Sequence, residues 1–483
     1  MKLNDPALFR QECYINGGWQ GSDKTFEVFD PADQSVIARV PSFGRSETAQ
    51  AIACAQAAWG PWRGLLARER SAILRRWYDL IVAHKDDLAT LMTWEQGKPL
   101  AESGGEVLYG ASYVEWFAEE AKRVYGDVIP TTQQGKRIVV LKEPVGVCAA
   151  ITPWNYPSAM ITRKAAPALA VGCPVIIKPA SQTPLSALAL AELAHRAGFP
   201  PGVFNVITGP PVEIGAEFTE NPIVRKLSFT GSTRVGKLLM SACAGSVKKI
   251  SLELGGHAPF IVFDDADLDE AVAGAMASKY RNSGQTCVCA NRFLVQDGIY
   301  DAFAEKFALA VNNDLRVGSG FDRQTNQGPL IDLNAVIKVE DQIADALAKG
   351  ATLISGGHRL DRAGFFFEPT VLAGVTSSMK IAHEETFGPV APLFRFTRED
   401  EAVALANDSE FGLASYFYSR DLARSWRVTE ALEYGMVGVN TGILSSEAAP
   451  FGGIKESGIG REGSKYGIDE YLEIKYMCVG GLQ

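Results

Sequence analysis

Two short motifs contain side chains that could bond covalently to a substrate and then release it. Cys287 lies in Gly284-Gln-Thr-Cys-Val-Cys289, among glycine and small polar residues, where an exposed nucleophile is expected. Glu253, in Leu252-Glu-Leu-Gly-Gly256, is a carboxylate at a predicted strand end that could activate water. Each residue also has a structural interpretation, since cysteines are commonly buried and glutamates commonly cap helices or pair with cations.

A proline-flanked asparagine follows an apolar run. In Thr152-Pro-Trp-Asn155-Tyr-Pro157, the Asn155 amide could donate to a developing oxyanion. Ligands of open α/β sheets bind beyond the carboxyl ends of the strands, and this is such an end. A turn between two prolines accounts for the same residues without a ligand.

The next run, Val175-Ile-Ile-Lys178-Pro-Ala-Ser181, ends in a cation and a hydroxyl. These groups could meet the adenosine ribose of a dinucleotide, and a solvated lysine is an equal alternative. A carboxylate at position 181 would repel a ribose 2′-phosphate, whereas Ser181 leaves room for the phosphate and can donate to it.

A further strand leads into a glycine turn and a helix start, in Ser228-Phe-Thr-Gly231-Ser232-Thr-Arg-Val-Gly-Lys237. Ser232 or Thr233 is the expected N-cap, and backbone N–H groups there could face a pyrophosphate. The motif is not GxGxxG, and helix starts of this kind are common without any ligand.

The apolar pattern predicts the elements that position these residues. Residues 46–123 read as a helical layer, and residues 144–254 alternate strands with helices, which is typical of a doubly wound parallel sheet. A second alternation, from Pro259–Phe263 to about residue 440, predicts a second α/β lobe. The expected strands of the first sheet are 146–152, 174–178, 203–208, 224–230 and 249–254.

Two strand-like segments fall outside this alternation. Lys136–Glu143 precedes the first sheet, and Tyr471–Val479 follows the second lobe. Unpaired apolar strands invite strand addition, so we expect these segments to pair with another chain.

Composition excludes several classes of protein. The 483 residues are 47% hydrophobic and 21% charged, which is typical of folded chains with two or three domains. The net charge of −9, without a Lys/Arg cluster, argues against nucleic acid as a partner. No secretory signal or membrane segment is apparent, so we expect a cytoplasmic protein. The eight scattered cysteines and five separated histidines favour neither a disulfide framework nor a metal site.

Seven ordered motifs together resemble those of the NAD(P)-dependent aldehyde dehydrogenases over nearly the whole chain. Five of them are described above and contain Asn155, Lys178, Gly231, Glu253 and Cys287, respectively. The other two are Glu384-Glu-Thr-Phe-Gly-Pro389 and Pro450-Phe-Gly-Gly-Ile-Lys455. Within the family, the sequence is most similar to the bacterial succinate-semialdehyde dehydrogenases. That similarity lies in Ile161–Lys164, Lys279–Asn282, Gln285–Asn291 and Asn440–Ser445.

The resemblance implies two doubly wound α/β lobes and a small β oligomerisation arm. The dinucleotide-binding domain would comprise residues 1–122 and 144–254, and the catalytic domain 255–455. The arm would comprise 123–143 and 456–483, and a homo-oligomer, either a tetramer or a dimer, is expected.

The resemblance also implies the role of each site residue. Cys287 would be the nucleophile, Asn155 an oxyanion donor and Glu253 the base for deacylation. The residues expected to bind the dinucleotide are Thr152, Pro153, Trp154, Lys178, Ser181, Gly231, Ser232, Glu385 and Phe387, with Glu385 on the nicotinamide ribose. Because Ser181 replaces an acidic residue, we expect NADP to be used at least as well as NAD.

The substrate implied by the resemblance is an aldehyde with a terminal carboxylate. Arg163 and Arg281 would clamp that carboxylate, with Ser445 as a hydroxyl donor. Succinate semialdehyde is the leading candidate and glutarate semialdehyde the alternative, since one methylene discriminates weakly. Arg281 could instead complement a helix dipole, and Arg163 could be a solvated helix residue.

Two nearby residues raise separate questions. In an extended segment, Cys289 would lie on the same side as Cys287, within reach of a regulatory disulfide. A small buried residue behind the nucleophile is the alternative for Cys289. His257 departs from the asparagine expected in close relatives, beside the nicotinamide.

Two rival classes remain at this stage: a thiol hydrolase or acyltransferase, and a structural protein without turnover. Both leave the Lys178 and Glu385 motifs unexplained.

Overall fold

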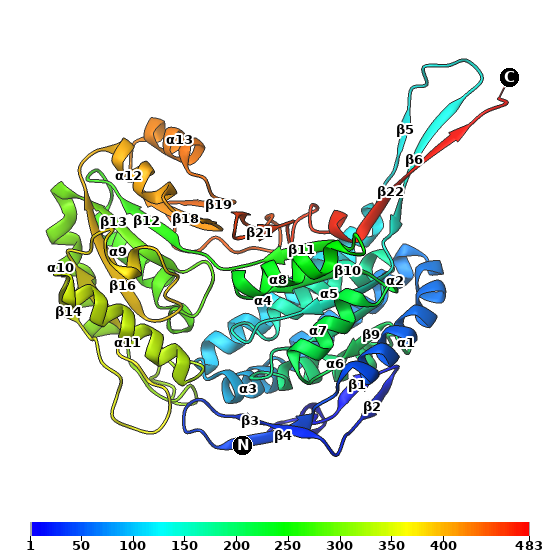
Figure 1. The fold of residues 1–483 in the computed structure, drawn as a ribbon, viewed down its shortest axis with the longest axis horizontal. Helices are drawn as coiled ribbons and strands as arrows, with labels where there is room; N and C mark the ends of the chain where they lie inside the picture. The colour runs from blue at the N-terminus through cyan, green and yellow to red at the C-terminus, as the bar shows by residue number, and fades with distance from the viewer. Residues whose placement is uncertain (1, 483) are drawn as a thin grey trace.

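The computed structural model describes residues 2–482, which form two α/β lobes and a projecting β arm (Figure 1). The arm carries the C-terminal strand away from the first lobe. The lobes and the arm agree with the predicted fold class, two doubly wound lobes and a small β extension.

The first lobe is built on an eight-stranded sheet in the order β2-β1-β9-β8-β7-β10-β11-β21. All of the predicted strands of this lobe form, and they are parallel: β7 (Val147–Ile151), β8 (Val175–Lys178), β9 (Phe204–Val206), β10 (Val224–Thr230) and β11 (Lys249–Glu253). The antiparallel edge strands are β1 (Cys13–Ile15), β2 (Gly18–Gln20) and β21 (Gly458–Ile459). The carboxyl ends of β7, β8, β10 and β11 therefore lie along one edge of the sheet.

Helices cover both faces of this sheet. The predicted helical layer is α1 (Arg45–Gly64), α2 (Ala67–Ala83), α3 (Lys85–Gln96) and α4 (Leu100–Glu120). The helices that connect the parallel strands are α5 (Ala159–Val171), α6 (Leu185–Ala197), α7 (Pro211–Glu220) and α8 (Thr233–Ala244). Trp77 of α2 is fully buried and packs edge-on against Phe199 and Phe204, which joins the helical layer to the sheet.

The second lobe contains a seven-stranded sheet in the order β14-β15-β16-β13-β12-β18-β19. Its strands are β12 (Ala258–Val262), β13 (Ala290–Gln296), β14 (Thr352–Ser355), β15 (Thr370–Ala373), β16 (Val390–Phe396), β18 (Ala414–Tyr418) and β19 (Met436–Val439). Its helices are α9 (Leu268–Lys279), α10 (Asp297–Asp314), α11 (Leu333–Ala348), α12 (Glu399–Asn407) and α13 (Leu422–Ala431). Only the β14–β15 pair at the edge is antiparallel.

Several short elements complete the chain between residues 2 and 482. The hairpin of β3 (Thr25–Phe29) and β4 (Val36–Pro41) and the pair of β17 (Phe411–Gly412) and β20 (Ile454–Lys455) are separate small sheets. The 3₁₀ turns are Pro6–Leu8, Ala121–Arg123, Arg281–Gly284, Lys380–Ala382 and Asp469–Tyr471.

The arm corrects the expectation that its strands pair only with another chain. β22 (Leu472–Val479) pairs antiparallel with β6 (Arg137–Pro144), and β5 (Asp127–Ile129) adds to the other side of β6. The partners are far apart in sequence, so local pattern could not reveal the pairing. Residues 456–471 do not enter the arm, because β21 pairs with β11 at the edge of the first sheet.

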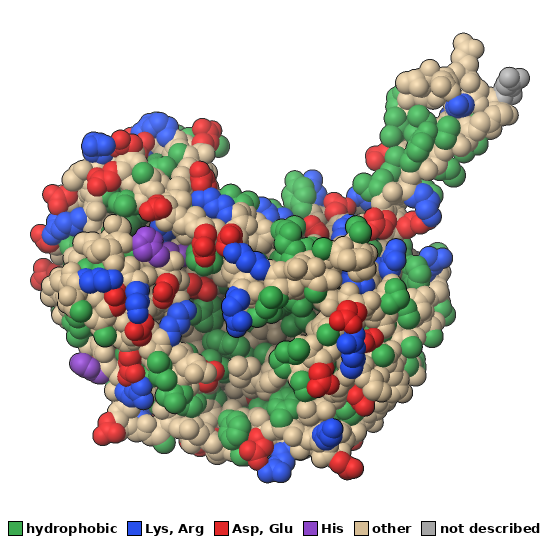
Figure 2. Space-filling model, in the orientation of Figure 1, with side chains coloured by type: hydrophobic (Ala, Val, Ile, Leu, Met, Phe, Trp, Pro, Cys, Tyr) green, Lys and Arg blue, Asp and Glu red, His purple; other side chains and the backbone are tan. Residues whose placement is uncertain are grey.

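Apolar side chains nevertheless remain uncovered on the arm. Val128 is 77% exposed, Ile474 74% and Tyr476 63%. Figure 2 shows hydrophobic side chains along the arm. An exposed apolar surface of this kind is typical of a protein–protein contact.

Two further predictions concern the chain as a whole. Each of the eight cysteines is free, in agreement with the absence of a disulfide framework. From residue 2 to residue 482, none of the helices combines the length and the apolar character needed to cross a bilayer.

Candidate active site

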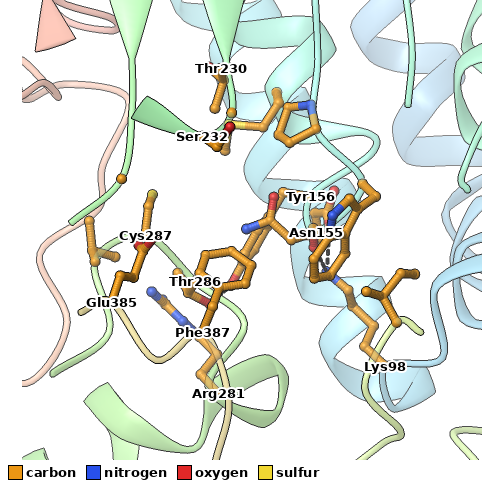
Figure 3. Close-up of a pocket in the computed structure, with 18 of the residues that line it drawn as sticks. Lys98, Asn155, Tyr156, Thr230, Ser232, Arg281, Thr286, Cys287, Glu385 and Phe387 are labelled. Atoms are coloured by element: carbon orange, nitrogen blue, oxygen red, sulfur yellow. Dashed lines mark hydrogen bonds and ion pairs between the residues drawn. The ribbon is translucent and has the colours of Figure 1, made fainter. Parts of the chain in front are cut away.

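A cavity of about 650 Å³ opens between the two lobes, where Figure 2 shows a hollow. The first lobe contributes the Asn155 and Gly231 motifs, and the second contributes the Cys287 and Glu385 motifs. Figure 3 shows these side chains facing one another across the cavity. The predicted site residues that line it are Pro153, Trp154, Asn155, Arg163, Gly231, Ser232, Arg281, Cys287, Glu385, Phe387 and Ser445.

Strand register brings the first-lobe motifs together. Ile151 of β7 lies opposite both Lys178 of β8 and Phe229 of β10, so the following residues leave the sheet side by side. The Thr152 N–H donates to the Lys178 carbonyl at 3.1 Å, and the Gly231 N–H donates to the Glu253 carbonyl at 3.1 Å. Four motifs that are separate in sequence therefore meet at one edge of the sheet.

Cys287 lies on a loop with unusual backbone geometry. Asn282 and Ser283 both have positive φ, 50° and 55°, which is costly for residues other than glycine and is often found at functional sites. The loop packs closely against Gly256, where an added Cβ would lie 2.3 Å from the Cys287 carbonyl oxygen. Only glycine allows this approach, which explains the second glycine of the Leu252–Gly256 motif.

The Cys287 thiol is half-buried and faces the cavity. Burial raises its pKa to about 12, with a further upward contribution from the Glu385 carboxylate. The thiol is therefore protonated at neutral pH in this state, and a base must accept its proton before it can attack.

Two N–H donors are available in or next to the loop that carries this thiol. Asn155 Nδ2 donates one hydrogen to the Gln285 carbonyl at 2.9 Å, which leaves its second hydrogen free. The Cys287 backbone N–H has no acceptor among residues 2–482. Together they form the kind of donor pair that stabilises an oxyanion on the carbon attacked by sulfur.

Glu253 lies near the site but does not line the cavity. Its side chain is 4% exposed, and Oε2 has no hydrogen-bond partner among the described residues. Burial, reinforced by the Glu462 carboxylate, raises the pKa of Glu253 well above its usual range. A carboxyl group with a raised pKa is suited to accept a proton near neutral pH.

The two candidate clamp arginines are in different electrostatic states. Arg163 is 1% exposed, pairs with Glu462 at 2.8 Å and lies over the Phe451 ring at 4.0 Å. Arg281 is half-buried, and its guanidinium forms no ion pair or hydrogen bond with any residue from 2 to 482. Arg281 therefore presents to the cavity a positive charge that has no ion-pair partner among residues 2–482, and Arg163 does not. The Arg281 charge opposes the rise that burial causes in the pKa of Glu102, which lines the same cavity.

The end of β8 fits the phosphorylated ribose of a dinucleotide. Lys178 is 4% exposed, and its ammonium group has no ion-pair partner between residues 2 and 482. Burial alone lowers its pKa to about 8. The buried hydroxyl of Thr152 also has no hydrogen-bond partner within the described part of the chain, and Ser181 follows on the adjoining loop. Buried polar groups without partners are expected where a ligand completes them.

The start of α8 fits the pyrophosphate. Ser232 is its N-cap and accepts a hydrogen bond from the Val235 N–H at 3.4 Å, so the first N–H groups of the helix remain free. Gly231 adjoins Phe229, whose ring atom Cζ would lie 2.5 Å from an added Cβ.

Glu385 and Phe387 fit the nicotinamide end. Glu385 accepts the Gly256 N–H at 3.0 Å, and burial raises its pKa to about 7. Phe387 has a positive φ of 53° and packs edge-on against Trp154, with ring centroids 5.5 Å apart. The strained backbone at Phe387 thus places its ring against Trp154, between the two lobes.

His257 is part of the scaffold beneath this region. It is 1% exposed, its Nε2 lies 2.9 Å from the Ala382 carbonyl, and burial lowers its pKa well below the usual range. A neutral imidazole just before the strand β12 therefore contacts the segment that precedes Glu385.

The Cys289 thiol is buried, and the geometry assumed for it was wrong. The Cys289 N–H donates to the Thr286 carbonyl at 3.0 Å, so residues 286–289 form a turn rather than an extended segment. Its Sγ donates to the Lys279 carbonyl at 3.6 Å.

Five residues that line the cavity were not predicted from the sequence: Lys98, Glu102, Glu106, Tyr109 and Tyr156. Charged residues in a helical layer are usually solvated, so nothing in the local sequence indicated that these charged side chains are buried. The only hint was Gly97-Lys98-Pro99, a break between two helices.

The comparisons with known proteins concern the chain as a whole. The family model described as the aldehyde dehydrogenase family matches residues 19–477. The chain is 63% identical to glutarate-semialdehyde dehydrogenase of Pseudomonas putida, covering 99% of this chain and 100% of that protein. It is 62% identical to succinate-semialdehyde dehydrogenase [NADP(+)] GabD of Escherichia coli, covering 99% and 100%. A crystal structure of succinate-semialdehyde dehydrogenase from Burkholderia pseudomallei superimposes with a TM-score of 0.98 at 64% identity, covering 99% and 100%.

Proposed function

This chain belongs to the aldehyde dehydrogenase family, and we propose that it oxidises succinate semialdehyde to succinate with NADP as the hydride acceptor. One observation carries the choice of substrate: the unpaired guanidinium of Arg281 faces the same cavity as the Cys287 thiol. A substrate with an aldehyde at one end and a carboxylate at the other satisfies both groups at once.

The first chemical step is attack by Cys287. The Cys287 proton passes to Glu253 or to a water molecule, and the sulfur then forms a bond with the aldehyde carbon while the carbonyl electron pair moves to oxygen to give the thiohemiacetal oxyanion. The free Asn155 amide hydrogen and the Cys287 backbone N–H hold that oxygen.

A nicotinamide bound at this site would accept the hydride from the thiohemiacetal carbon, leaving a thioester. Lys178 and Ser181 would hold the phosphorylated ribose, Gly231 and Ser232 the pyrophosphate, and Glu385 the nicotinamide ribose. Thr152, Pro153, Trp154 and Phe387 would enclose the cofactor. NAD is the alternative cofactor, and Ser181 in place of a carboxylate favours NADP.

Deacylation returns the enzyme to its starting state. Water attacks the thioester carbon, the carbon–sulfur bond breaks, and the acid leaves. Glu253 accepts the proton of that water, for which its raised pKa is suited. Because Glu253 does not line the cavity, either its side chain must rotate or a water must bridge to the thioester.

Two substitutions test this mechanism. Cys287→Ala should abolish aldehyde oxidation and leave NADP binding intact, whereas Glu253→Gln should retain a rapid first turnover and slow the later ones. Stopped-flow absorbance of the reduced nicotinamide separates the burst from the steady state. A normal steady-state rate in Cys287→Ala would reject the mechanism, and a hydrolase or a structural protein would give no reduced cofactor at all.

Glutarate semialdehyde is the second candidate substrate. The Pseudomonas putida relative carries that name at 63% identity, and one additional methylene changes specificity by only about 1–3 kcal/mol. The ratio of kcat/KM for the two semialdehydes decides between them.

We further propose that the protein is a cytoplasmic homo-oligomer, a tetramer or a dimer. The exposed apolar side chains of β5, β22 and the adjoining loop support a contact between arms of neighbouring subunits. The free cysteines are consistent with a reducing compartment. Light scattering of the purified chain gives the subunit number.

A further inference from the structure

A buried ion pair lies directly beneath Asn155. The side chains of Lys98 and Glu106 are each 1% exposed, and Nζ lies 2.6 Å from Oε2. Lys98 Nζ also donates to the Asn155 carbonyl at 2.6 Å. Glu106 Oε1 accepts the N–H groups of Ser158 and Ala159, at 2.9 and 3.1 Å. The pair therefore holds both ends of the segment from residue 155 to residue 159.

Both charged groups of this pair have several partners. Two of the three ammonium hydrogens of Lys98 have acceptors, and the ammonium lies 4.1 Å from the centre of the Tyr156 ring. Figure 3 shows Lys98 beside Asn155 and Tyr156. A buried ion pair adds little net stability, because desolvation offsets the attraction. The partners of this pair instead restrict the geometry of the Asn155–Ala159 segment that it contacts.

The Asn155 segment is also tied to the loop of the nucleophile. Asn282 Nδ2 donates to the carbonyls of Asn155 and Gln285, at 3.1 and 3.2 Å. Gln96 Nε2, at the end of α3, donates to Asn282 Oδ1 at 3.0 Å. The Asn155 amide in turn donates to Gln285, two residues before Cys287. The ion pair thus fixes the donor relative to the thiol.

We propose that Lys98 and Glu106 are positioning residues, which hold the Asn155 amide where the oxyanion forms and thereby set the rate of acylation and hydride transfer. The inference rests on the proposed role of Asn155. A displacement of about 1 Å at a reacting centre can lower the rate about 10²-fold, so loss of the ion pair that positions Asn155 should slow the reaction.

The test uses the full-length protein and the burst of reduced nicotinamide at saturating NADP and aldehyde. Asn155→Ala should slow the burst by about 10²–10³-fold, the usual loss for one oxyanion donor. Lys98→Met should slow it by about 10–100-fold, with the NADP dissociation constant and the rate of Cys287 alkylation by iodoacetamide within about twofold of wild type.

Epistasis separates positioning from a general loss of structure. If Lys98 acts through the Asn155 amide, adding Lys98→Met to Asn155→Ala should slow the burst by less than about twofold. If the double variant lost the product of the two single-variant rate losses, the proposal would be overturned. A rise in the aldehyde KM with a normal burst would also overturn it, because Lys98 would then contact substrate directly.

Glu106→Gln provides a second variant in case Lys98→Met does not fold. Its matched control is Glu95→Gln, because Glu95 is equally buried and accepts the Leu185 and Ser186 N–H groups at the start of α6, at 2.6 and 2.8 Å. Glu106→Gln should slow the burst at least about tenfold and Glu95→Gln should not, at matched melting temperatures. Equal losses in both variants would overturn the proposal.

The outcomes also distinguish this inference from the function on which it rests. A normal burst in Asn155→Ala would remove the proposed role of Asn155, and with it the reason for a support. A slow burst in Asn155→Ala with a normal burst in Lys98→Met would reject only the positioning role of the ion pair.

Discussion

Replacing Arg281 with leucine should change substrate preference more than it changes the chemistry. The guanidinium has no ion-pair partner in residues 2–482, so its removal breaks no salt bridge of the protein, although the Glu102 carboxyl loses a nearby positive charge. The bound succinate semialdehyde would lose its counter-charge instead. Loss of one member of a buried ion pair costs about 3–5 kcal/mol. Because Arg281 is half-buried, we use the lower limit of about 3 kcal/mol, which corresponds to a decrease in kcat/KM of about 150-fold.

The assay compares two aldehydes of the same shape. In 4-methylpentanal, two methyl groups replace the carboxylate oxygens of succinate semialdehyde, so the clamp has nothing charged to bind. We expect Arg281→Leu to lower kcat/KM about 150-fold for succinate semialdehyde and less than about threefold for 4-methylpentanal. The loss should appear mainly in KM, since the carboxylate is bound equally in the ground state and the transition state.

Arg281→Lys is the matched control. Lysine keeps the positive charge and loses the two-pronged geometry, so a loss of about tenfold is expected for the semialdehyde. Equal losses for both aldehydes in Arg281→Leu would refute the clamp, because the side chain would then only support the loop that carries Cys287. An undiminished rate with succinate semialdehyde would refute it as well.

Three other predictions concern the cofactor and the second cysteine. Ser181→Glu should reverse the preference for NADP over NAD by introducing repulsion toward the 2′-phosphate, and unchanged selectivity in steady-state assays would reject that assignment. Because the pKa of Lys178 is lowered to about 8, its charge is lost above that pH. The dissociation constant of NADP should therefore rise by up to about tenfold per pH unit above 8, and Lys178→Met should bind weakly without this slope in fluorescence titrations. If Cys289 traps an oxidised Cys287, wild type treated with peroxide should recover with a thiol reductant and Cys289→Ala should not; equal recovery would show that Cys289 has no such function.

The sequence was most informative where structure is local or where ligand chemistry demands a particular residue. Short apolar runs bounded by glycine or proline predicted the strands β7 to β11, because a buried parallel strand must be apolar on both faces. The motifs at their carboxyl ends predicted where Asn155 and Gly231 would meet, since parallel neighbours end at the same edge.

Contacts between segments distant in sequence could not be predicted in this way. β22 pairs with β6 across more than three hundred residues, so each strand looked unpartnered when read alone. The turn at residues 286–289 also required the folded loop, because nothing in Thr286-Cys-Val-Cys289 distinguishes a turn from an extended segment.

By itself, the sequence indicated the family and its class of reaction, because seven motifs in a fixed order resemble those of the aldehyde dehydrogenases, whereas each motif read alone also had a structural interpretation. The tertiary structure alone decided which charges are free to act. Arg163 and Arg281 are the same residue type near the same cavity, yet Glu462 neutralises only the first. Lys98 and Glu106 read as ordinary charges of a helical layer, and only folding removes them from water and brings them beneath Asn155. The physical reason is that burial and charge pairing depend on groups brought together from distant parts of the chain, which no local pattern specifies.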